Sequence, residues 1–344
     1  MRAVQLVETG RPLQDREIAR PDPGPQEVRV RVVAAGICHS DAHYRRGGPR
    51  LGRLPQTLGH EVAGIIDALG AEVRGPGLGD RVCLHYLVTC GDCARCRRGE
   101  EQFCPRAEMI GKDRDGGFAE FIVVPARNAI RIPDGLAFDH AALMMCSSAT
   151  AWHALVKGRL AAGERLLVFG IGGLGVSALQ LARVFGAAEV YAVDRVPAKL
   201  ALAERMGAIA VNAAEEDPIE ALARRGAGGV DVALDFVGTP ATLAAAVKCL
   251  APRGRAVFVG IGDQPFAVDP YRDILAKEAE IIGCSDHLHG ELETLLALAA
   301  RGGLDLSLAL DRRLPLEAAA INAALDALEA GTETVRSVIQ VGQG

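Results

Sequence analysis

The pattern of apolar and polar residues changes near residue 150. Before it, segments rich in β-branched residues, such as 27–37 and 61–70, are separated by Pro and Gly, as in PDPGP at 21–25. β-Branched residues favour strands, whereas Pro and Gly favour turns. Residues 1–150 are therefore predicted to form a mostly β domain with irregular loops.

After residue 150, short apolar segments alternate with Ala- and Leu-rich helical segments, such as 174–187 and 197–208. Six apolar segments are predicted to be strands: 165–170, 189–194, 208–212, 230–238, 255–261 and 280–284. Repeated strand–helix units imply a parallel sheet covered on both faces, and six strands complete a dinucleotide-binding fold. Residues 151–284 are predicted to be this doubly wound domain, so the fold class is α/β.

The chain becomes helical after Cys284 and ends in a strand-like segment at 334–342, TVRSVIQVG. We expect residues 285–344 to return to the first domain. Apart from the strand–helix alternation, the sequence shows no internal repeat and no low-complexity segment.

Composition and charge narrow the function classes. The 344 residues are 49% hydrophobic and 24% charged, with a formal net charge of -5. The basic residues are spread along the chain, which is not the footprint of a protein that binds nucleic acid or an anionic membrane. No apolar stretch approaches the roughly 20 residues that span a bilayer, and MRAVQLVETGRPL at the N-terminus lacks the apolar core of a signal peptide. We therefore expect a cytoplasmic protein without nucleic-acid or membrane partners.

Four of the nine cysteines form a C-x2-C-x2-C-x7-C motif: Cys90, Cys93, Cys96 and Cys104. Four thiolates on short loops suit a closed tetrahedral zinc site, and Gly91 and Gly99 let the backbone turn tightly around it. An iron–sulfur cluster also uses four cysteines, and free thiols or partial disulfides are the remaining alternatives. Because a closed four-sulfur zinc has no open position, its predicted role is to hold a lobe in place, one option being a subunit contact.

Three separated segments carry further ligand-type residues: GICHSDAH (36–43), LGHEVAG (58–64) and MMCSSATAW (144–152). Each residue alone is more often a packed core residue. Together, however, Cys38, His60 and Cys146 supply two sulfurs and one nitrogen, a set that leaves the fourth position of a catalytic zinc open. Such a zinc makes a bound alcohol acidic near neutral pH. Glu61 is expected to act beside this metal, and Asp41 to accept the ring N–H of His60.

A glycine-rich turn, GIGGLG at 170–175, reads G-x-G-G-x-G. It comprises Gly170, Gly172, Gly173, Leu174 and Gly175, together with Ile171. It follows a predicted strand and opens a predicted helix, which is the context of a dinucleotide-binding turn that holds a pyrophosphate. About 20 residues later, Asp194 is expected to bind the adenosine ribose and to repel the extra phosphate of NADP. Arg195 partly counters that repulsion, but the sequence favours NAD.

Together these features resemble the zinc-containing alcohol dehydrogenases of the medium-chain dehydrogenase/reductase superfamily. GHE at 59–61, the four-cysteine motif, the glycine turn and Cys146 occur in the family's order and approximate spacing, and the resemblance covers essentially the whole chain. It implies a GroES-like, mostly β catalytic domain made from both chain ends, with a Rossmann domain inserted. It also implies two zinc ions per chain, and hydride transfer between a primary or secondary alcohol and NAD.

The resemblance further implies roles for single positions. Cys38, His60 and Cys146 match the catalytic zinc ligands. Ser40 matches the hydroxyl that receives the alcohol proton, and His43 matches the end of the proton relay, reached through a ribose hydroxyl of the cofactor. The expected cofactor contacts outside the glycine turn and Asp194 are His39 at the pyrophosphate, Thr150 by the nicotinamide, Lys199 at the adenosine ribose, and Ile261 at the end of the predicted strand 255–261.

The sequence departs from the family pattern near residues 283–292. Family members often read G-x-x-x-G-x-R there, whereas this chain reads GCSDHLHGEL, with His287 and His289 but no Arg. Polyol dehydrogenases typically place a Glu near Cys146, so this cysteine favours the alcohol dehydrogenase branch. Pro49 falls where ethanol-preferring relatives often carry a bulky aromatic residue, which predicts a roomier pocket, and Tyr86 is a candidate wall for the substrate.

Two other functions compete with alcohol oxidation. The nearer is a zinc-dependent reductase of aldehydes, ketones or enones, which would run similar machinery in the opposite direction. The more distant is a non-catalytic zinc-binding interaction protein, for which Ser40, His43 and the dispersed ligands would be superfluous. We expect a small-molecule substrate that no motif identifies, and a homo-oligomer, either tetramer or dimer.

Overall fold

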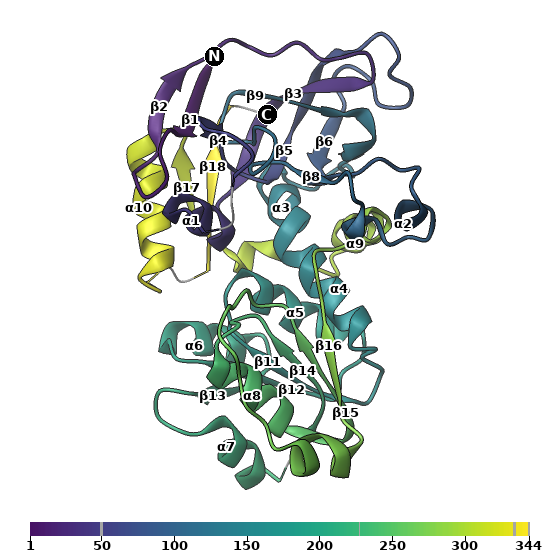
Figure 1. The fold of residues 1–344 in the computed structure, drawn as a ribbon, viewed down its shortest axis with the longest axis vertical. Coiled ribbons are helices and arrows are strands. Elements are labelled where there is room, and N and C mark those ends of the chain that lie inside the picture. Colours follow the sequence, from purple (N-terminus) through teal and green to yellow (C-terminus); the bar gives the residue numbers. More distant parts are fainter. Residues whose placement is uncertain (49–50, 227, 333–334, 343–344) are drawn as a thin grey trace. The chain divides into compact units, whose positions relative to one another are not determined.

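The computed structural model describes residues 1–48, 51–226, 228–332 and 335–342, and the chain divides into two compact units (Figure 1). Unit 1 comprises Met1–Cys146, Leu288–Gly302 and Leu306–Gly344. Unit 2 comprises Ser147–His287 and Gly303–Asp305. Each unit has its own hydrophobic core.

Unit 1 is built on β-sheets. Its strands are β1 (Arg2–Leu6), β2 (Gln14–Glu17), β3 (Glu27–Gly36), β4 (Gln56–Thr57), β5 (Glu61–Leu69), β6 (Arg81–Leu84), β7 (Leu87–Val88), β8 (Glu108–Met109), β9 (Phe121–Pro125), β10 (Ala129–Arg131), β17 (Leu310–Pro315) and β18 (Arg336–Gln340). The largest sheet has the order β10-β6-β5-β3-β18-β17, with β9 also paired to β3. A second sheet has the order β2-β1-β4, and β7 pairs with β8.

Strand β3 is the centre of the large sheet. It pairs antiparallel with β5, from Val28 opposite Leu69 to Gly36 opposite Glu61. It also pairs with the C-terminal strand β18, where Val338 lies opposite Gly36, so the end of the chain returns to this sheet. Eight of the ten residues of β3 are buried, which explains why Val and Ala occupy six of its positions. Burying one such Val stabilises the fold by about 1.5–3 kcal/mol.

The helices of unit 1 are short. They are α1 (His39–Arg46), α2 (Ala94–Arg97), α3 (Phe138–Leu143), α9 (His289–Ala300) and α10 (Ala318–Glu329), with 3-10 turns η1 (Glu101–Phe103), η2 (Ala126–Asn128) and η6 (Leu306–Leu308), and a π turn, η3 (Met144–Ser148), that leads into unit 2. Helix α1 is fastened to α10 because Arg45 Nη2 lies 2.6 Å from the carboxylate of Asp326 and 3.1 Å from that of Glu329. This contact fixes the helix that begins directly after Cys38.

Unit 2 contains one parallel sheet flanked by helices (Figure 1). Its strands are β11 (Arg165–Phe169), β12 (Glu189–Asp194), β13 (Ile209–Asn212), β14 (Val230–Asp235), β15 (Leu250–Phe258) and β16 (Glu280–Gly283). Its helices are α4 (Ala149–Lys157), α5 (Gly173–Val184), α6 (Pro197–Arg205), α7 (Pro218–Arg224) and α8 (Pro240–Lys248), with the π turn η4 (Pro270–Ile274) and the 3-10 turn η5 (Leu275–Lys277).

The strand order of this sheet is β13-β12-β11-β14-β15-β16, and every pairing is parallel. The order reverses between β11 and β14, which is the topology of a doubly wound dinucleotide-binding domain. The α/β fold class and the six predicted strands are therefore confirmed. Leu167, Phe169, Val193 and Val211 belong to the buried core of the unit.

All nine cysteines are free thiols, so the described chain is held together without disulfides. No helix among the described residues is both long enough and apolar enough to cross a bilayer.

Candidate functional site

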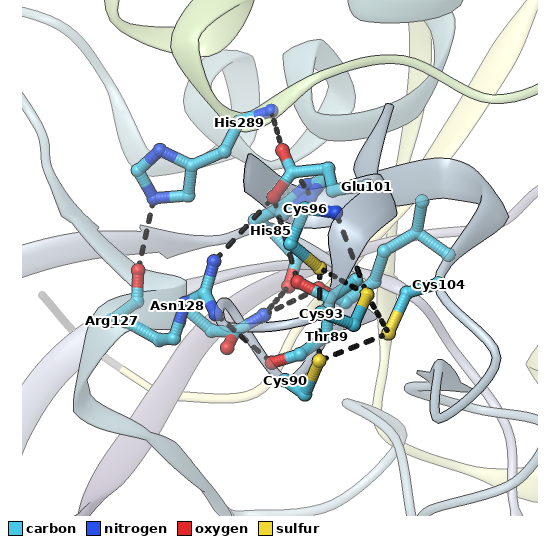
Figure 2. Close-up of polar contacts among 11 residues, drawn as sticks. His85, Thr89, Cys90, Cys93, Cys96, Glu101, Cys104, Arg127, Asn128 and His289 are labelled. Carbon is cyan, nitrogen blue, oxygen red and sulfur yellow. Dashed lines mark hydrogen bonds and ion pairs between the residues drawn. The ribbon is translucent and has the colours of Figure 1, made fainter. Parts of the chain in front are cut away.

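The sulfur atoms of the four-cysteine motif converge in unit 1 (Figure 2). Four Sγ–Sγ distances are 3.5 Å for Cys93–Cys96 and Cys90–Cys104, 3.8 Å for Cys90–Cys96 and 3.9 Å for Cys93–Cys104. Zinc–sulfur bonds of about 2.3 Å in a tetrahedron place the sulfurs about 3.8 Å apart. The donor set therefore fits one zinc ion, whereas a multinuclear iron–sulfur cluster needs wider separations.

Local backbone geometry brings these four sulfurs together. Cys93 caps helix α2, and its Sγ accepts the N–H of Cys96 at 3.5 Å. Gly91 and Gly99 have φ angles of +76° and +71°, a conformation that other residues adopt only with strain. Since all the turns lie within 15 residues of chain (90–104), the motif spacing was sufficient to predict this site.

A second group of ligand-type residues is buried in unit 1: Cys38, His60, Glu61 and Cys146. One ligand atom from each lies within 4.8 Å of the others. Cys38 stands at the start of α1, His60 and Glu61 at the start of β5, and Cys146 in the turn η3. His60 Nε2 is buried and makes no hydrogen bond to the described residues. A buried imidazole nitrogen facing two thiols suits a metal ion, so this donor set also fits zinc.

Asp41 connects two segments of this group. Its Oδ2 accepts the backbone N–H of Cys38 at 2.9 Å, and its Oδ1 accepts that of Gly59 at 3.2 Å. Asp41 Oδ1 also lies 3.6 Å from His60 Nδ1, the ring atom that it was predicted to bond, but this distance is longer than a hydrogen bond. Since Asp41 is fully buried, water does not compete for these contacts.

Glu61 pairs with Arg336, a residue that the sequence analysis missed. Arg336 lies on β18, its Nη2 bonds Glu61 Oε2, and both side chains are buried. Gly36 leaves room for this pair, because a Cβ atom there would meet Glu61 Oε2 at 2.0 Å. Burial raises the pKa of Glu61, and the guanidinium opposes that rise. No local motif marks Arg336, since 275 residues separate the two partners.

The charges around the group favour a thiolate. A hydrogen bond from Cys146, together with the imidazole of His60, holds the pKa of the Cys38 thiol well below its ordinary value. Arg336 acts in the same direction. A thiolate is the form of cysteine that binds metal.

The residues predicted to move the proton lie on α1. Ser40 Oγ is 3.8 Å from Cys38 Sγ, and His43 is half-buried one turn further along the helix. The rings of His39 and His43 have centroids 4.9 Å apart. Burial, followed by the nearby charges of His39 and Arg46, lowers the pKa of His43. His43 is thus largely neutral at pH 7, the form that accepts a proton.

The glycine turn in unit 2 joins β11 to α5. Gly170 has a φ of +87°, and a Cβ atom on Gly175 would meet the carbonyl oxygen of Gly170 at 2.1 Å. Gly170 and Gly175 are therefore closed to larger residues, whereas Gly172 has open space beside it at the N-terminus of α5, which begins with Gly173 and Leu174. That end can hold an anion such as a pyrophosphate.

Asp194 ends β12 beside this turn. Its Oδ2 accepts the N–H of Ile171 at 2.8 Å, and its Oδ1 accepts those of Arg195 and Val196 at 2.7 and 3.0 Å. The carboxylate is thus fixed by backbone of both the turn and the following loop. The other predicted cofactor contacts in unit 2 are Thr150, buried on α4, Lys199 on α6, and Ile261, which is 71% exposed after β15.

Three further positions were singled out in the sequence: His289, Tyr86 and Pro49. His289 contacts backbone of unit 1, since its Nε2 lies 2.9 Å from the carbonyl oxygen of Arg127 (Figure 2). Tyr86 is buried, and its ring meets that of His60 edge-on at 5.3 Å. Pro49 lies outside the described residues.

Comparison with known proteins gives two family matches. Residues 24–134 match the alcohol dehydrogenase GroES-like domain, and residues 173–301 match the zinc-binding dehydrogenase family. The chain is 38% identical to an NAD-dependent alcohol dehydrogenase of Saccharolobus solfataricus over 274 residues, which are 76% of this chain and 78% of that protein. It is 32% identical to an L-threonine 3-dehydrogenase of Pectobacterium atrosepticum over 302 residues, 86% and 83% of the two chains.

Among solved structures, the chain is similar to a zinc-binding dehydrogenase from Sinorhizobium meliloti bound to NADP. The TM-score is 0.89 at 30% identity, over 98% of each chain.

The two donor sets predict two zinc ions per chain. Elemental analysis of protein purified without chelators should give two. Cys93→Ser and Cys38→Ser should each lower the count to one. The first should also lower the melting temperature, because zinc organises the four-cysteine lobe, whereas the second should keep the fold and lose activity. Cys249→Ser, which changes a buried cysteine outside both sets, should retain two. A wild-type count of one or less would contradict this assignment.

The Glu61–Arg336 pair predicts a large stability effect. Arg336→Met leaves a buried carboxylate without its counter-charge, which should cost about 3–5 kcal/mol in the free energy of unfolding. The double variant Glu61→Gln/Arg336→Met should recover much of the loss, as measured by denaturant unfolding at one protein concentration. Equal losses in the single and double variants would show that the pair is not the cause.

Proposed function

The chain belongs to the zinc-containing alcohol dehydrogenases of the medium-chain dehydrogenase/reductase superfamily, and we propose that it acts as a general alcohol dehydrogenase on primary or secondary alcohols. It is a zinc-dependent oxidoreductase that transfers a hydride between an alcohol and NAD. The observation that carries the finer proposal is the buried group of Cys38, His60 and Cys146 beside the hydroxyl of Ser40. Cys146 supports the alcohol branch of the family over the polyol branch.

Cys38, His60 and Cys146 are proposed to hold the catalytic zinc, and the four-cysteine lobe the structural one. A bound catalytic zinc supplies Lewis acidity, which makes an alcohol hydroxyl acidic near neutral pH. The carboxylate of Asp41, whose Oδ1 lies 3.6 Å from His60 Nδ1, is proposed to orient the imidazole by its negative charge. Glu61 and Arg336 surround the thiolates with a neutral pair, so the pocket gains no net charge from them.

Ser40 and His43 are proposed to carry the alcohol proton away. The Ser40 hydroxyl can accept one proton while it donates another. His43, with its lowered pKa, is ready to accept that proton at pH 7 and to release it to solvent.

Unit 2 is proposed to hold the nicotinamide cofactor. The N-terminus of α5 and the glycine turn receive the pyrophosphate. Asp194 and Lys199 bind the adenosine ribose, with Arg195 alongside, while Thr150 and Ile261 lie by the nicotinamide end. The fixed negative charge of Asp194 supports NAD over NADP, since a 2′-phosphate would meet it directly.

We further propose a homo-oligomer, tetramer or dimer, in the cytoplasm. Nine free thiols, six of them in the two zinc donor sets, need a reducing compartment to remain competent for metal.

The function is tested by cofactor and substrate together. A panel of primary, secondary and aromatic alcohols, with L-threonine included, should show turnover of simple alcohols and a higher kcat/KM with NAD than with NADP. Asp194→Ser should lower kcat/KM with NAD by about tenfold or more, because charge-assisted hydrogen bonds to the ribose are lost, and should reduce the preference over NADP.

Asp217→Ser is the matched control for this prediction. Asp217 also accepts backbone N–H groups, at the start of α7, but it lies away from the glycine turn. Its substitution should leave the NAD-to-NADP ratio unchanged. The cofactor assignment is wrong if the wild-type enzyme prefers NADP, and the substrate assignment is wrong if only L-threonine is oxidised.

The proton relay predicts unequal losses at its two ends. Ser40→Ala should lower kcat by about 10²–10⁴-fold, because the first proton acceptor is lost, and Ser40→Thr should retain activity. His43→Ala should be milder, and an amine buffer should restore part of its rate. In the wild type, kcat should fall on the acid side of the ordinary histidine range, because the pKa of His43 is lowered, and this acid limb should disappear in His43→Ala. A near-wild-type kcat for Ser40→Ala, with an isotope effect showing rate-limiting hydride transfer, would refute the relay.

A further inference from the structure

The chain bends between strands β6 and β7, and this bend contains Tyr86, whose ring contacts that of His60. Strand β6 ends at Leu84 and β7 begins at Leu87, so His85 and Tyr86 form a bend between them. Tyr86 is 3% exposed, and its ring stands at 81° to that of His60. The position of this ring therefore determines the shape of the space on one side of the proposed catalytic centre.

One buried side chain bonds the bend on both sides of Tyr86. Asn128 Nδ2 donates to the carbonyl oxygens of His85 and Leu87, each at 2.8 Å (Figure 2). The backbone N–H of His85 in turn donates to the carbonyl oxygen of Asn128 at 2.9 Å. Asn128 directly precedes β10, whose pairing with β6 ends at Ala129 opposite Leu84. The Asn128 side chain thus supplies hydrogen bonds to the bend where the backbone pairing of β6 with β10 has ended.

The chemistry of this position is specific to a short primary amide. An amide nitrogen carries two N–H donors, which match the two carbonyl oxygens. An aspartate has the same shape but only acceptors, and a leucine has neither. Because Asn128 is 2% exposed, either substitution leaves two buried carbonyl oxygens without this donor.

The neighbouring residue fastens the other end of the same segment. Arg127 Nη1 donates to the carbonyl oxygen of Thr89 at 3.0 Å, and its Nη2 lies 3.4 Å from Glu101 Oε2. Thr89 directly precedes Cys90, so Arg127 supports the four-cysteine lobe (Figure 2). Asn128 therefore supports the bend at Tyr86, whereas Arg127 supports the four-cysteine lobe. A substitution of Arg127 can serve as the control for one of Asn128.

We propose that Asn128 is a positioning residue that sets substrate selectivity by fixing Tyr86 against His60. This proposal rests on the proposed alcohol dehydrogenase activity, with Tyr86 as a wall of the substrate pocket. Asn128 acts through the backbone of residues 85–87 and does not itself contact the reacting atoms. Its loss changes which alcohols fit beside His60 while the metal ligands remain in place.

The first experiment measures the bend directly. In Asn128→Leu, hydrogen exchange should become about tenfold faster or more at the amides of His85 and Ile110, because the hydrogen bonds that hold the bend are lost. The Ile110 amide is a suitable reporter, since it donates to the carbonyl oxygen of Tyr86 at 3.0 Å. In Arg127→Met these amides should exchange as in the wild type. Unchanged exchange in Asn128→Leu would overturn the proposal.

The second experiment measures selectivity. The ratio of kcat/KM for benzyl alcohol to that for ethanol should change several-fold in Asn128→Leu, with two zinc ions retained. Arg127→Met should lower zinc retention by the lobe but leave this ratio unchanged. In a Tyr86→Ala background, Asn128→Leu should have no further effect on the ratio, since both changes act through the same ring.

Two results would overturn the selectivity role: an unchanged ratio in Asn128→Leu, or effects of Asn128 and Tyr86 that combine independently. If Asn128→Leu does not fold, Asn128→Ser, which keeps one hydrogen-bond donor, replaces it. Hydrogen exchange and the kcat/KM ratio of that variant then test the selectivity role. Absence of NAD-dependent alcohol turnover by the wild type would instead overturn the proposed function, and the selectivity role with it, whereas hydrogen exchange would still report on the bend.

Discussion

The buried carboxylate of Asp41 is the contact on which the catalytic half of the structure depends. It accepts backbone N–H groups from Cys38 and Gly59 and lies beside the His60 ring, so it joins the two segments beyond their last strand pair, Gly36 opposite Glu61. Inside a dry core these hydrogen bonds are strong, and leaving a partner unpaired is costly. The positions of Cys38, His60 and the start of α1, with Ser40 and His43, all follow from this one group.

Charge balance is the second constraint on the same region. The Cys38 thiol, whose pKa is lowered, and the Glu61 carboxyl lie in a buried volume, where the positive charge of Arg336 favours the charged form of each. The coulombic attraction of Glu61 and Cys38 keeps the pKa of Arg336 raised although burial opposes it. Because β18 pairs with β3, it places Arg336 beside Glu61. The C-terminal strand therefore contributes both to the sheet and to the charge balance of the site. The return of the chain end to unit 1 thus has a chemical role as well as a packing role.

The two metal-binding groups of unit 1 are joined by a short stretch of chain. Tyr86 packs on His60, and four residues later Cys90 enters the other donor set. Arg127 and Asn128 hold this stretch at two points, and Glu101 also accepts the backbone N–H of His289 at the start of α9 (Figure 2). One continuous stretch of unit 1 therefore carries residues of both donor sets, and two adjacent side chains hold its two ends separately.

The sequence by itself determined what short-range spacing encodes. The strand–helix alternation predicted the sheet of unit 2, the glycine turn with Asp194 predicted its anion-binding end, and the cysteine spacing at 90–104 predicted a four-sulfur group, because in each case the partners are local. Cys38, His60 and Cys146 were proposed from their residue types and from family resemblance but not from spacing, since their meeting depends on sheet pairing and on Asp41. Arg336 and Asn128 carry no signal at all in the sequence. Their partners lie 275 and about 40 residues away, and only the tertiary structure brings a donor to an acceptor across such distances along the chain.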